Sequence, residues 1–348
     1  MLTNQPIELE KALQQQRRGA LLIDVRSPAE FAEATIPGAI NVPIFSNEER
    51  AQVGTVFKQQ GKKDARRLGV ELVSPRIPDL IKQVDEARQG ISGPVIIFCW
   101  RGGMRSLAIT SFLNLAGIPA QQLIGGHKAF RRMVVDYFEN EQWLPVFVFR
   151  GLTGVGKTRV LHKLQKRNYP VVDLEGLANH RGSAFGALGL EPQPSQKMFE
   201  ALLWNCLDRF KDERYLLTEG ESLHIGRVLV PKRFHQAMQV QKSIWLTASL
   251  ETRTQVILEE YPALDQLRDQ FVRPLSSLKE RLGKVVLAEF SELLETGQWG
   301  ALVRELMVRY YDPLYLHTLP EQRAEICLDD FESGVEQIIQ MLELLTSE

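Results

Sequence analysis

The chain has 348 residues, of which 44% are hydrophobic and 24% are charged, and its formal net charge at pH 7 is −1. This composition is typical of a globular protein, and the length exceeds that of one hydrophobic core, so we expect two domains. The apolar runs are far shorter than the roughly 20 residues of a membrane-spanning helix, and the polar start lacks a signal pattern. We therefore expect a cytoplasmic protein that does not bind membranes.

The first 140 residues predict a parallel α/β domain, because strand and helix patterns alternate along them. Residues 45–78 are polar and charged and indicate a helical insertion. The other predicted elements are strands at 20–25, within 36–43, at 95–98 and at 122–124, and helices at 28–34, 79–89, 107–116 and 128–140.

A second domain is predicted over residues 141–348, because a new strand, a glycine-rich loop and a helix begin there. Together with the first domain, residues 1–140, this predicts an α/β protein whose second half is a P-loop NTPase-like domain with a helical C-terminal part. Its predicted strands are 146–149, 171–174, 215–218 and 243–247, and helices are expected from 250 through 259, at 278–295 and at 299–314.

Charge is distributed unevenly between the halves. Residues 1–140 carry 18 lysines and arginines against 14 acids, whereas the remainder carries 24 against 29. The N-terminal half is therefore the better candidate for binding a polyanion, through the pairs Lys62–Lys63, Arg66–Arg67 and Arg131–Arg132. Solvated helix faces have the same pattern, so both interpretations stay open.

A cysteine begins a loop between the 95–98 strand and the following helix. Converging backbone N–H groups and the start of a helix stabilise a thiolate, and glycines allow the loop to curl so that its amides point inward. We predict that Cys99 is a functional thiol in a cradle for a dianion or a persulfide; a buried strand-end cysteine is the alternative. The cradle comprises Trp100, Arg101, Gly102, Gly103, Met104, Arg105 and Ser106.

A second anion-binding loop follows the strand at 146–149. The pattern Gly-x-x-x-x-Gly-Lys-Thr after a strand and before an apolar-periodic helix is that of a phosphate-binding P-loop. The lysine neutralises phosphate, and the threonine hydroxyl is placed to hold Mg²⁺; we predict no other metal site and no tightly bound cofactor. The predicted phosphate-binding residues are Gly151, Thr153, Gly154, Val155, Gly156, Lys157 and Thr158.

Carboxylates at the end of a second strand often accompany a P-loop. Asp173, Glu219 and Glu221 are the candidates, although ordinary strand-end polar residues have the same pattern. Polar loops carry further candidates for the site around the P-loop. Separately, we predict that two cysteines pack in the core. The loop candidates are His180, Arg181 and Arg227, and the packed cysteines are Cys206 and Cys327.

The first domain resembles the rhodanese family. The resemblance rests on Ile23-Asp24-Val25-Arg26, Glu30-Phe31, the run Ile36 to Asn41, the cysteine loop and Gly125-Gly126, in matching order. It implies a loop cysteine that carries transferable sulfur, with Asp24 and Arg26 orienting the loop or forming only a cap and a surface salt bridge. Ala34-Thr35 stands where this family often has Gly-His.

A rhodanese-like domain followed directly by a P-loop domain, with the loop Cys-Trp-Arg-Gly-Gly-Met-Arg-Ser, resembles the tRNA 2-selenouridine synthase family over nearly the whole chain. The resemblance implies a transferase that acts on tRNA with 5-substituted 2-thiouridine at the wobble position. It implies that selenium from selenophosphate replaces the sulfur of this nucleoside, and that an enzyme supplying selenophosphate is a partner. It also implies that the same sulfur is geranylated by geranyl diphosphate.

We hypothesise that the P-loop binds geranyl diphosphate and that Cys99, with Arg101 and Arg105, handles selenium, either as an adduct or by positioning the donor. Apolar helices beyond Leu250 can line a prenyl pocket or only pack. Two alternatives remain open. One is a rhodanese-type sulfurtransferase coupled to an ATPase or kinase, and the other is a nucleotide-dependent switch that binds tRNA.

Overall fold

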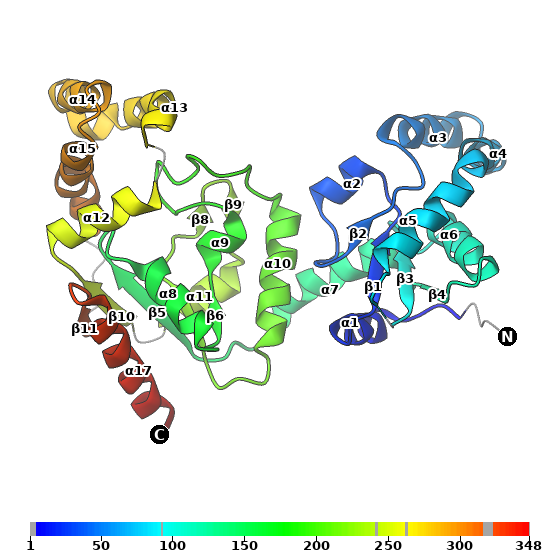
Figure 1. The fold of residues 1–348 in the computed structure, drawn as a ribbon, viewed down its shortest axis with the longest axis horizontal. Helices are drawn as coiled ribbons and strands as arrows, with labels where there is room; N and C mark the ends of the chain where they lie inside the picture. The colour runs from blue at the N-terminus through cyan, green and yellow to red at the C-terminus, as the bar shows by residue number, and fades with distance from the viewer. Residues whose placement is uncertain (1–4, 92, 241–242, 262–263, 316–322, 348) are drawn as a thin grey trace. The chain divides into compact units, whose positions relative to one another are not determined.

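The computed structural model describes residues 5–91, 93–240, 243–261, 264–315 and 323–347. The chain forms two compact units (Figure 1). Among the described residues, no helix combines the length and the apolar character needed to cross a membrane. Unit 1 comprises Met1–Asn140 together with Glu200–Trp204, and unit 2 comprises Glu141–Phe199 and Asn205–Glu348.

Unit 1 is built on a four-stranded parallel sheet in the order β2-β1-β3-β4. Both central strands are buried along their whole length, as expected for parallel strands covered by helices on both faces. The elements are α1 Leu9–Arg17, β1 Leu21–Asp24, α2 Pro28–Glu33, β2 Ile40–Asn41, α3 Asn47–Gln59, α4 Lys62–Val73, the 3₁₀ turn Ser74–Arg76, α5 Ile77–Ala87, β3 Val95–Phe98, α6 Met104–Leu115, β4 Ala120–Gln122 and α7 Gly126–Asn140.

Local sequence signals account for several helix starts in unit 1. Ser27 and Glu30 form a capping box at the start of α2, and Pro28 occupies its first turn. Ser46 and Glu49 form the same box at α3. The predicted parallel sheet and the helical insertion are confirmed, and the insertion consists of α3 and α4.

Unit 2 contains a five-stranded parallel sheet in the order β11-β10-β5-β7-β6 and a short antiparallel hairpin, β8-β9. Its elements from residue 146 to residue 247 are β5 Val146–Gly151, α8 Lys157–Lys166, β6 Val171–Val172, α9 Leu174–Ala178, α10 Gln196–Arg209, β7 Leu216–Glu219, β8 His224–Ile225, β9 Val228–Leu229, α11 Lys232–Val240 and β10 Ser243–Thr247.

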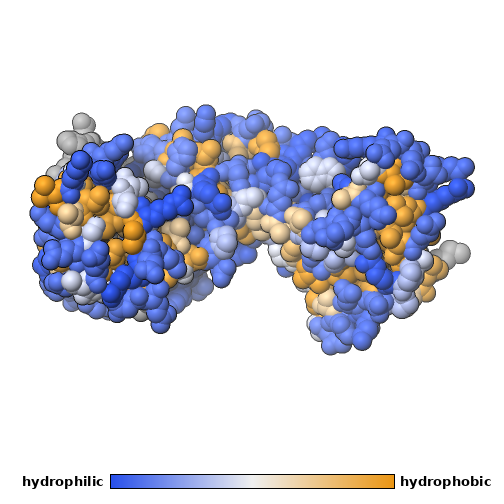
Figure 2. All heavy atoms as spheres, turned by 90° about the horizontal axis from the view of Figure 1, so that it is seen from above, coloured by the Kyte–Doolittle hydropathy of each residue, from blue (hydrophilic) through white to orange (hydrophobic). Residues whose placement is uncertain are grey.

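The C-terminal part of unit 2 is mainly helical, as predicted. Helices α12 to α15 lie together beyond one end of the sheet (Figure 1) and enclose their own apolar cluster. Hydrophilic side chains cover most of the face of each unit that is seen in Figure 2. The elements are α12 Leu250–Glu260, α13 Leu264–Ser277, α14 Lys279–Glu295, α15 Trp299–Leu306, a π-helical turn Met307–Tyr311, α16 Asp312–Tyr315, β11 Arg323–Cys327 and α17 Phe331–Ser347.

The structure corrects the prediction in the last third of the chain. Residues 323–327, for which the sequence predicted no strand, form an edge strand, β11, which pairs with β10 within the otherwise mainly helical C-terminal part. Cys327 ends this strand and is exposed, so its prediction as a core residue was wrong. Cys206 is half-buried on α10, and burial raises the pKa of its thiol to about 11, as expected for a packed cysteine.

Two glycines of unit 1 share a positive φ but differ in how closely other backbone approaches them. Gly126 begins α7 with a positive φ, and a Cβ there would lie 2.1 Å from the Cys99 carbonyl oxygen. Gly117 also has a positive φ, but a Cβ there would meet no atom within 4 Å.

Gly117→Ala should therefore cost only about 1–2 kcal/mol of backbone strain. Gly126→Ala should cost several kcal/mol more, because two backbone segments must separate. Urea denaturation followed by circular dichroism measures both free energies of unfolding. Equal losses for the two variants would contradict the close approach.

Candidate active sites

The cysteine loop begins where β3 ends, and its sulfur is held from inside the loop. Cys99 is 3% exposed, and its Sγ accepts a hydrogen bond from the Gly103 N–H at 3.3 Å. The Ser106 hydroxyl lies 3.2 Å from the sulfur and 3.1 Å from the Gly103 carbonyl oxygen. Its single hydrogen can serve either acceptor, so a negative sulfur can gain a second donor by rotation of one hydroxyl.

Gln122 fixes the loop from β4, and sequence reasoning missed it. Its side-chain amide donates to the carbonyl oxygens of Gly102 and Gly103 and to the Ser106 hydroxyl, at 2.9–3.0 Å. Because these two carbonyls point towards Gln122, the Gly103 N–H between them faces the sulfur. An isolated glutamine at a strand end carries no motif that could have revealed this role.

The two arginines of the loop differ in what they contact. Arg105 forms an ion pair with Glu30 at 2.7 Å, whereas Arg101 is exposed. Burial tends to raise the pKa of Glu30, but the hydrogen bond and the charge of Arg105 outweigh it and lower this pKa. Arg101 is therefore the better placed of the two for an external anion. Trp100 is half-buried beside His127, and Met104 is exposed.

Asp24 and Arg26 form a buried ion pair rather than a surface salt bridge, with a shortest distance of 2.6 Å. Asp24 also accepts a hydrogen bond from the Thr35 hydroxyl, and Arg26 donates to the Ala34 carbonyl oxygen. The described contacts of the pair thus anchor the segment at 34–35. They reach the cysteine loop only through the neighbouring strand, where the Val25 N–H donates to the Phe98 carbonyl.

The P-loop occupies the turn between β5 and α8. Gly154 and Gly156 have positive φ angles, and a Cβ on Gly151 would lie 2.5 Å from the Leu246 carbonyl oxygen, so the loop depends on its glycines. Arg253 of α12 supports it by donating to the Thr153 carbonyl at 2.9 Å while pairing with Asp312. Val155 is buried beneath the loop.

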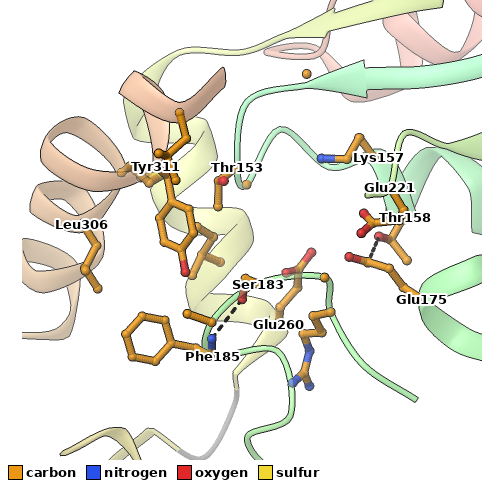
Figure 3. Close-up of a pocket in the computed structure, with 18 of the residues that line it drawn as sticks. Thr153, Lys157, Thr158, Glu175, Ser183, Phe185, Glu221, Glu260, Leu306 and Tyr311 are labelled. Carbon is orange, nitrogen blue, oxygen red and sulfur yellow. Dashed lines mark hydrogen bonds between the residues drawn. The ribbon is translucent and has the colours of Figure 1, made fainter. Parts of the chain in front are cut away.

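A cavity of about 870 Å³ opens beside the P-loop, and its two ends differ in character (Figure 3). Lys157, Thr158, Glu175 and Glu221 stand at the polar end. The opposite end is apolar and is formed by α12, α13, α15, the π-helical turn, α16 and the loop that carries Phe185. Its lining includes Phe185, Ile257, Leu264, Phe271, Trp299, Leu302, Val303, Leu306, Met307 and Leu314.

Three carboxylates line this cavity close to one another. The Thr158 hydroxyl donates to Glu175 at 3.1 Å, and Glu175 shares a hydrogen bond with Glu221. Burial, followed by the charge of Glu175, raises the pKa of Glu221 to about 8. Burial also raises the pKa of Glu175 and of Glu260. At least one proton is therefore held between Glu175 and Glu221 near neutral pH.

The structure separates the three predicted strand-end carboxylates. Glu221 lines the cavity. Glu219 is completely buried behind it and accepts from the Glu175 N–H at 2.7 Å, and burial raises its pKa well above the ordinary value. Asp173 caps α9 through the Gly176 N–H and contacts His162. The cavity carboxylates that sequence reasoning missed, Glu175 and Glu260, lie on helices α9 and α12.

Of the three candidates in polar loops, one lines the cavity and two do not. Arg181 lines the cavity, where its guanidinium stacks on the Tyr261 ring at 4.4 Å and donates to the Leu188 carbonyl. His180 is buried and Arg227 is bound to Gln193, and neither is among the residues that line the described cavity. Thr158 and Glu175 offer oxygen atoms of the kind that Mg²⁺ takes together with phosphate oxygens and water.

The fold and these sites define an α/β protein with a rhodanese-like unit followed by a P-loop unit. Comparison with family models agrees: residues 6–133 match the rhodanese-like domain, and residues 144–344 match the tRNA 2-selenouridine synthase AAA domain. The chain is 34% identical to the tRNA 2-selenouridine synthase of Nitrosomonas europaea and 34% identical to that of Hydrogenovibrio crunogenus. Each alignment covers 92% of this chain and 94% of the relative. The chain belongs to the tRNA 2-selenouridine synthase family.

The raised carboxyl pKa values predict how stability depends on pH. A carboxyl group whose pKa is higher in the folded state stabilises the fold below the unfolded-state pKa, and this contribution is lost as the pH rises through the folded-state value. For Glu221 this contribution is lost between about pH 4.5 and about pH 8.

Glu221→Gln keeps a hydrogen-bond donor for Glu175, but the amide of glutamine does not ionise in this pH range. The variant should therefore gain stability relative to the native chain as the pH rises from 5 to 8, by about 3–4 kcal/mol. Urea unfolding at several pH values measures the difference. A difference that did not change with pH would argue against the buried proton.

Proposed function

We propose that this chain converts wobble 5-substituted 2-thiouridine in tRNA to 2-selenouridine in two steps. In the first, geranyl diphosphate alkylates the 2-thio sulfur. In the second, selenium from selenophosphate displaces geranylthiol. Family membership supports the overall conversion, and the observation that carries the first step is the cavity with a phosphate-binding loop at one end and an apolar wall at the other.

The shape of the cavity suits a prenyl diphosphate. The diphosphate would lie against the P-loop amides and Lys157, and the hydrocarbon chain would lie among the apolar side chains of α12, α13, α15 and the π-helical turn. Burying a ten-carbon chain from water there is favourable by about 0.8 kcal/mol for each CH₂ group. Both ends of the ligand would thus find matching surfaces in one cavity.

The alkylation is a substitution at an allylic carbon. The sulfur lone pair forms the new C–S bond, the C–O bond breaks, its electron pair leaves with the diphosphate, and the uridine loses its N3 proton. Negative charge accumulates on the leaving diphosphate, where the P-loop amides, Lys157 and Arg181 can stabilise it. A bound Mg²⁺, held by Thr158 and Glu175, would neutralise part of the same charge.

The cysteine loop is assigned to the second step. Selenophosphate is an anion, and the loop presents the Gly103 amide, the Ser106 hydroxyl and the exposed Arg101 around Cys99. The selenium of selenophosphate bonds to C2 of the uridine ring, the C–S bond breaks, and geranylthiol leaves with a proton. Water then attacks the phosphorus atom, the Se–P bond breaks with its electron pair staying on selenium, and phosphate leaves. The two anion-binding loops would therefore serve two successive transfers.

Substitution of one residue in each loop should separate the two steps. In cells that lack the native protein, Lys157→Ala should leave 2-thiouridine in tRNA and reduce the geranylated nucleoside at least about 100-fold. Cys99→Ser should abolish 2-selenouridine while the geranylated nucleoside accumulates. Nucleoside mass spectrometry of total tRNA distinguishes these outcomes. Intact geranylation in Lys157→Ala with loss of selenation would show that the loops are wrongly assigned.

The apolar wall predicts chain-length selectivity. Leu306 lines the cavity, whereas Leu294 packs in the same apolar cluster but is not part of the lining. Leu306→Ala should raise the ratio of kcat/KM for farnesyl diphosphate over geranyl diphosphate by about tenfold, since each added methylene that fits is worth about 1 kcal/mol or more.

Leu294→Ala is the control, because it removes the same side chain from the same cluster and should destabilise the fold by a similar 2–5 kcal/mol. Its selectivity should stay at the native value. The two diphosphates are compared in one competition assay, with products separated by mass. A parallel change in both variants would show that the cavity does not hold the prenyl chain.

A further inference from the structure

One helix of the insertion carries a cluster of cations on a single face. Lys62, Lys63, Arg66 and Arg67 are all exposed on α4. Their spacing places them within about 140° around the helix axis at 3.6 residues per turn. Ala65 and Leu72 lie on the other side, where Ala65 is buried and Leu72 packs against the core of unit 1. We call these four cations the basic face of α4.

The cations of this face differ from other arginines of unit 1. Arg50, Arg76 and Arg105 each form an ion pair with a glutamate. Within the part of the chain that the structure describes, none of the four side chains of the basic face forms such a pair.

Local acids do not balance the charge of the face either. Residues 58–73 hold five lysines and arginines against two acids, which gives a net charge of +3. The two acids, Asp64 and Glu71, fall beyond one flank of the face at helical spacing. Concentrated cations without anionic partners repel one another, and the repulsion is relieved when a polyanion supplies the missing charge.

We propose that the basic face of α4 binds the phosphate backbone of the tRNA substrate. This inference rests on the proposed function, which makes tRNA the polyanion that the chain must hold. The face belongs to the same unit as the cysteine loop. Figure 2 views unit 1 from the side of α3 and α4, and its surface there is largely hydrophilic with a strip of apolar side chains.

Exposed apolar side chains also occur on α4 and on the neighbouring helix α3. Val70, on the same face of α4, is 67% exposed, and Phe57, near the end of α3, is 55% exposed. Surfaces that combine cations with exposed aromatic and apolar groups are typical of RNA contact, since the sugar and base edges are partly apolar. This combination favours RNA over an acidic protein as the occupant.

The test replaces all four cations by glutamine, which keeps helix propensity and removes the charge. Lys62→Gln, Lys63→Gln, Arg66→Gln and Arg67→Gln combined should weaken binding of the full-length protein to 2-thiouridine tRNA at least tenfold at 0.15 M salt. The slope of log K against log salt should become shallower by about 2–4, because each lost phosphate contact removes about 0.7–0.9. Fluorescence anisotropy of labelled tRNA, titrated from 0.05 to 0.3 M salt, measures both.

The control removes the same number of each cation from unit 2. The chosen residues are exposed on α13 and α14, where residues 264–295 hold five lysines and arginines against six acids. They are Arg273, Lys279, Arg281 and Lys284. Their combined change to glutamine should leave affinity and slope within a factor of two of the native chain. Exchanging lysine and arginine within the basic face of α4 should also preserve binding. Circular dichroism and the melting temperature verify the fold of every variant.

The outcomes separate this inference from the proposed function. Native affinity and salt slope in the folded α4 variant overturn the inference and leave the proposed function standing, as does an equal loss in the unit 2 control. A native chain that bound no tRNA would overturn both. In the geranylation assay, the α4 variant should raise KM for tRNA at least tenfold while kcat and the KM for geranyl diphosphate stay at native values.

Discussion

Both candidate sites depend on a backbone turn at the carboxyl end of a buried parallel strand. After β3 the chain passes Gly102 in a left-handed conformation, and after β5 it passes Gly154 and Gly156 in the same region. At Gly102 and Gly154 a side chain is excluded because other backbone lies too close. A Cβ on Gly102 would be 2.5 Å from the Leu123 carbonyl oxygen, and one on Gly154 would be 2.7 Å from the Arg253 carbonyl oxygen. In each unit, the carboxyl end of a parallel strand thus places a loop whose backbone amides are available to an anion.

This constraint explains how much of the molecule the sequence could predict. Apolar runs specified β1, β3 and β10 almost residue for residue, because strands buried on both faces need continuous hydrophobicity. The edge strand β11 was missed for the opposite reason. Only part of it is buried, its sequence Arg-Ala-Glu-Ile-Cys contains two charged residues, and it lies among helices in the chain.

The sites were predictable as far as their chemistry lies in contiguous residues. The cysteine loop and the P-loop are local patterns, and the structure places both at strand ends. Gln122, Glu175 and Arg253 act from positions 16 to 100 residues away from the groups they contact. No short spacing relates them to either loop, so only the folded chain shows that they support the sites. The apolar wall is similar, since residues that line a cavity and residues that pack have the same hydrophobicity.

The carboxylates beside the P-loop give the cavity a charge that depends on its contents. Glu175, Glu221 and Glu260 would repel a diphosphate if all three were ionised, yet burial favours their neutral forms. An arriving anion raises their pKa values further and draws in protons, whereas an accompanying divalent cation lowers them and releases protons. The protonation of this cluster is therefore coupled to the ligand. A P-loop motif alone predicts where a phosphate would lie, whereas the acids around it would determine the counter-charge with which a phosphate binds.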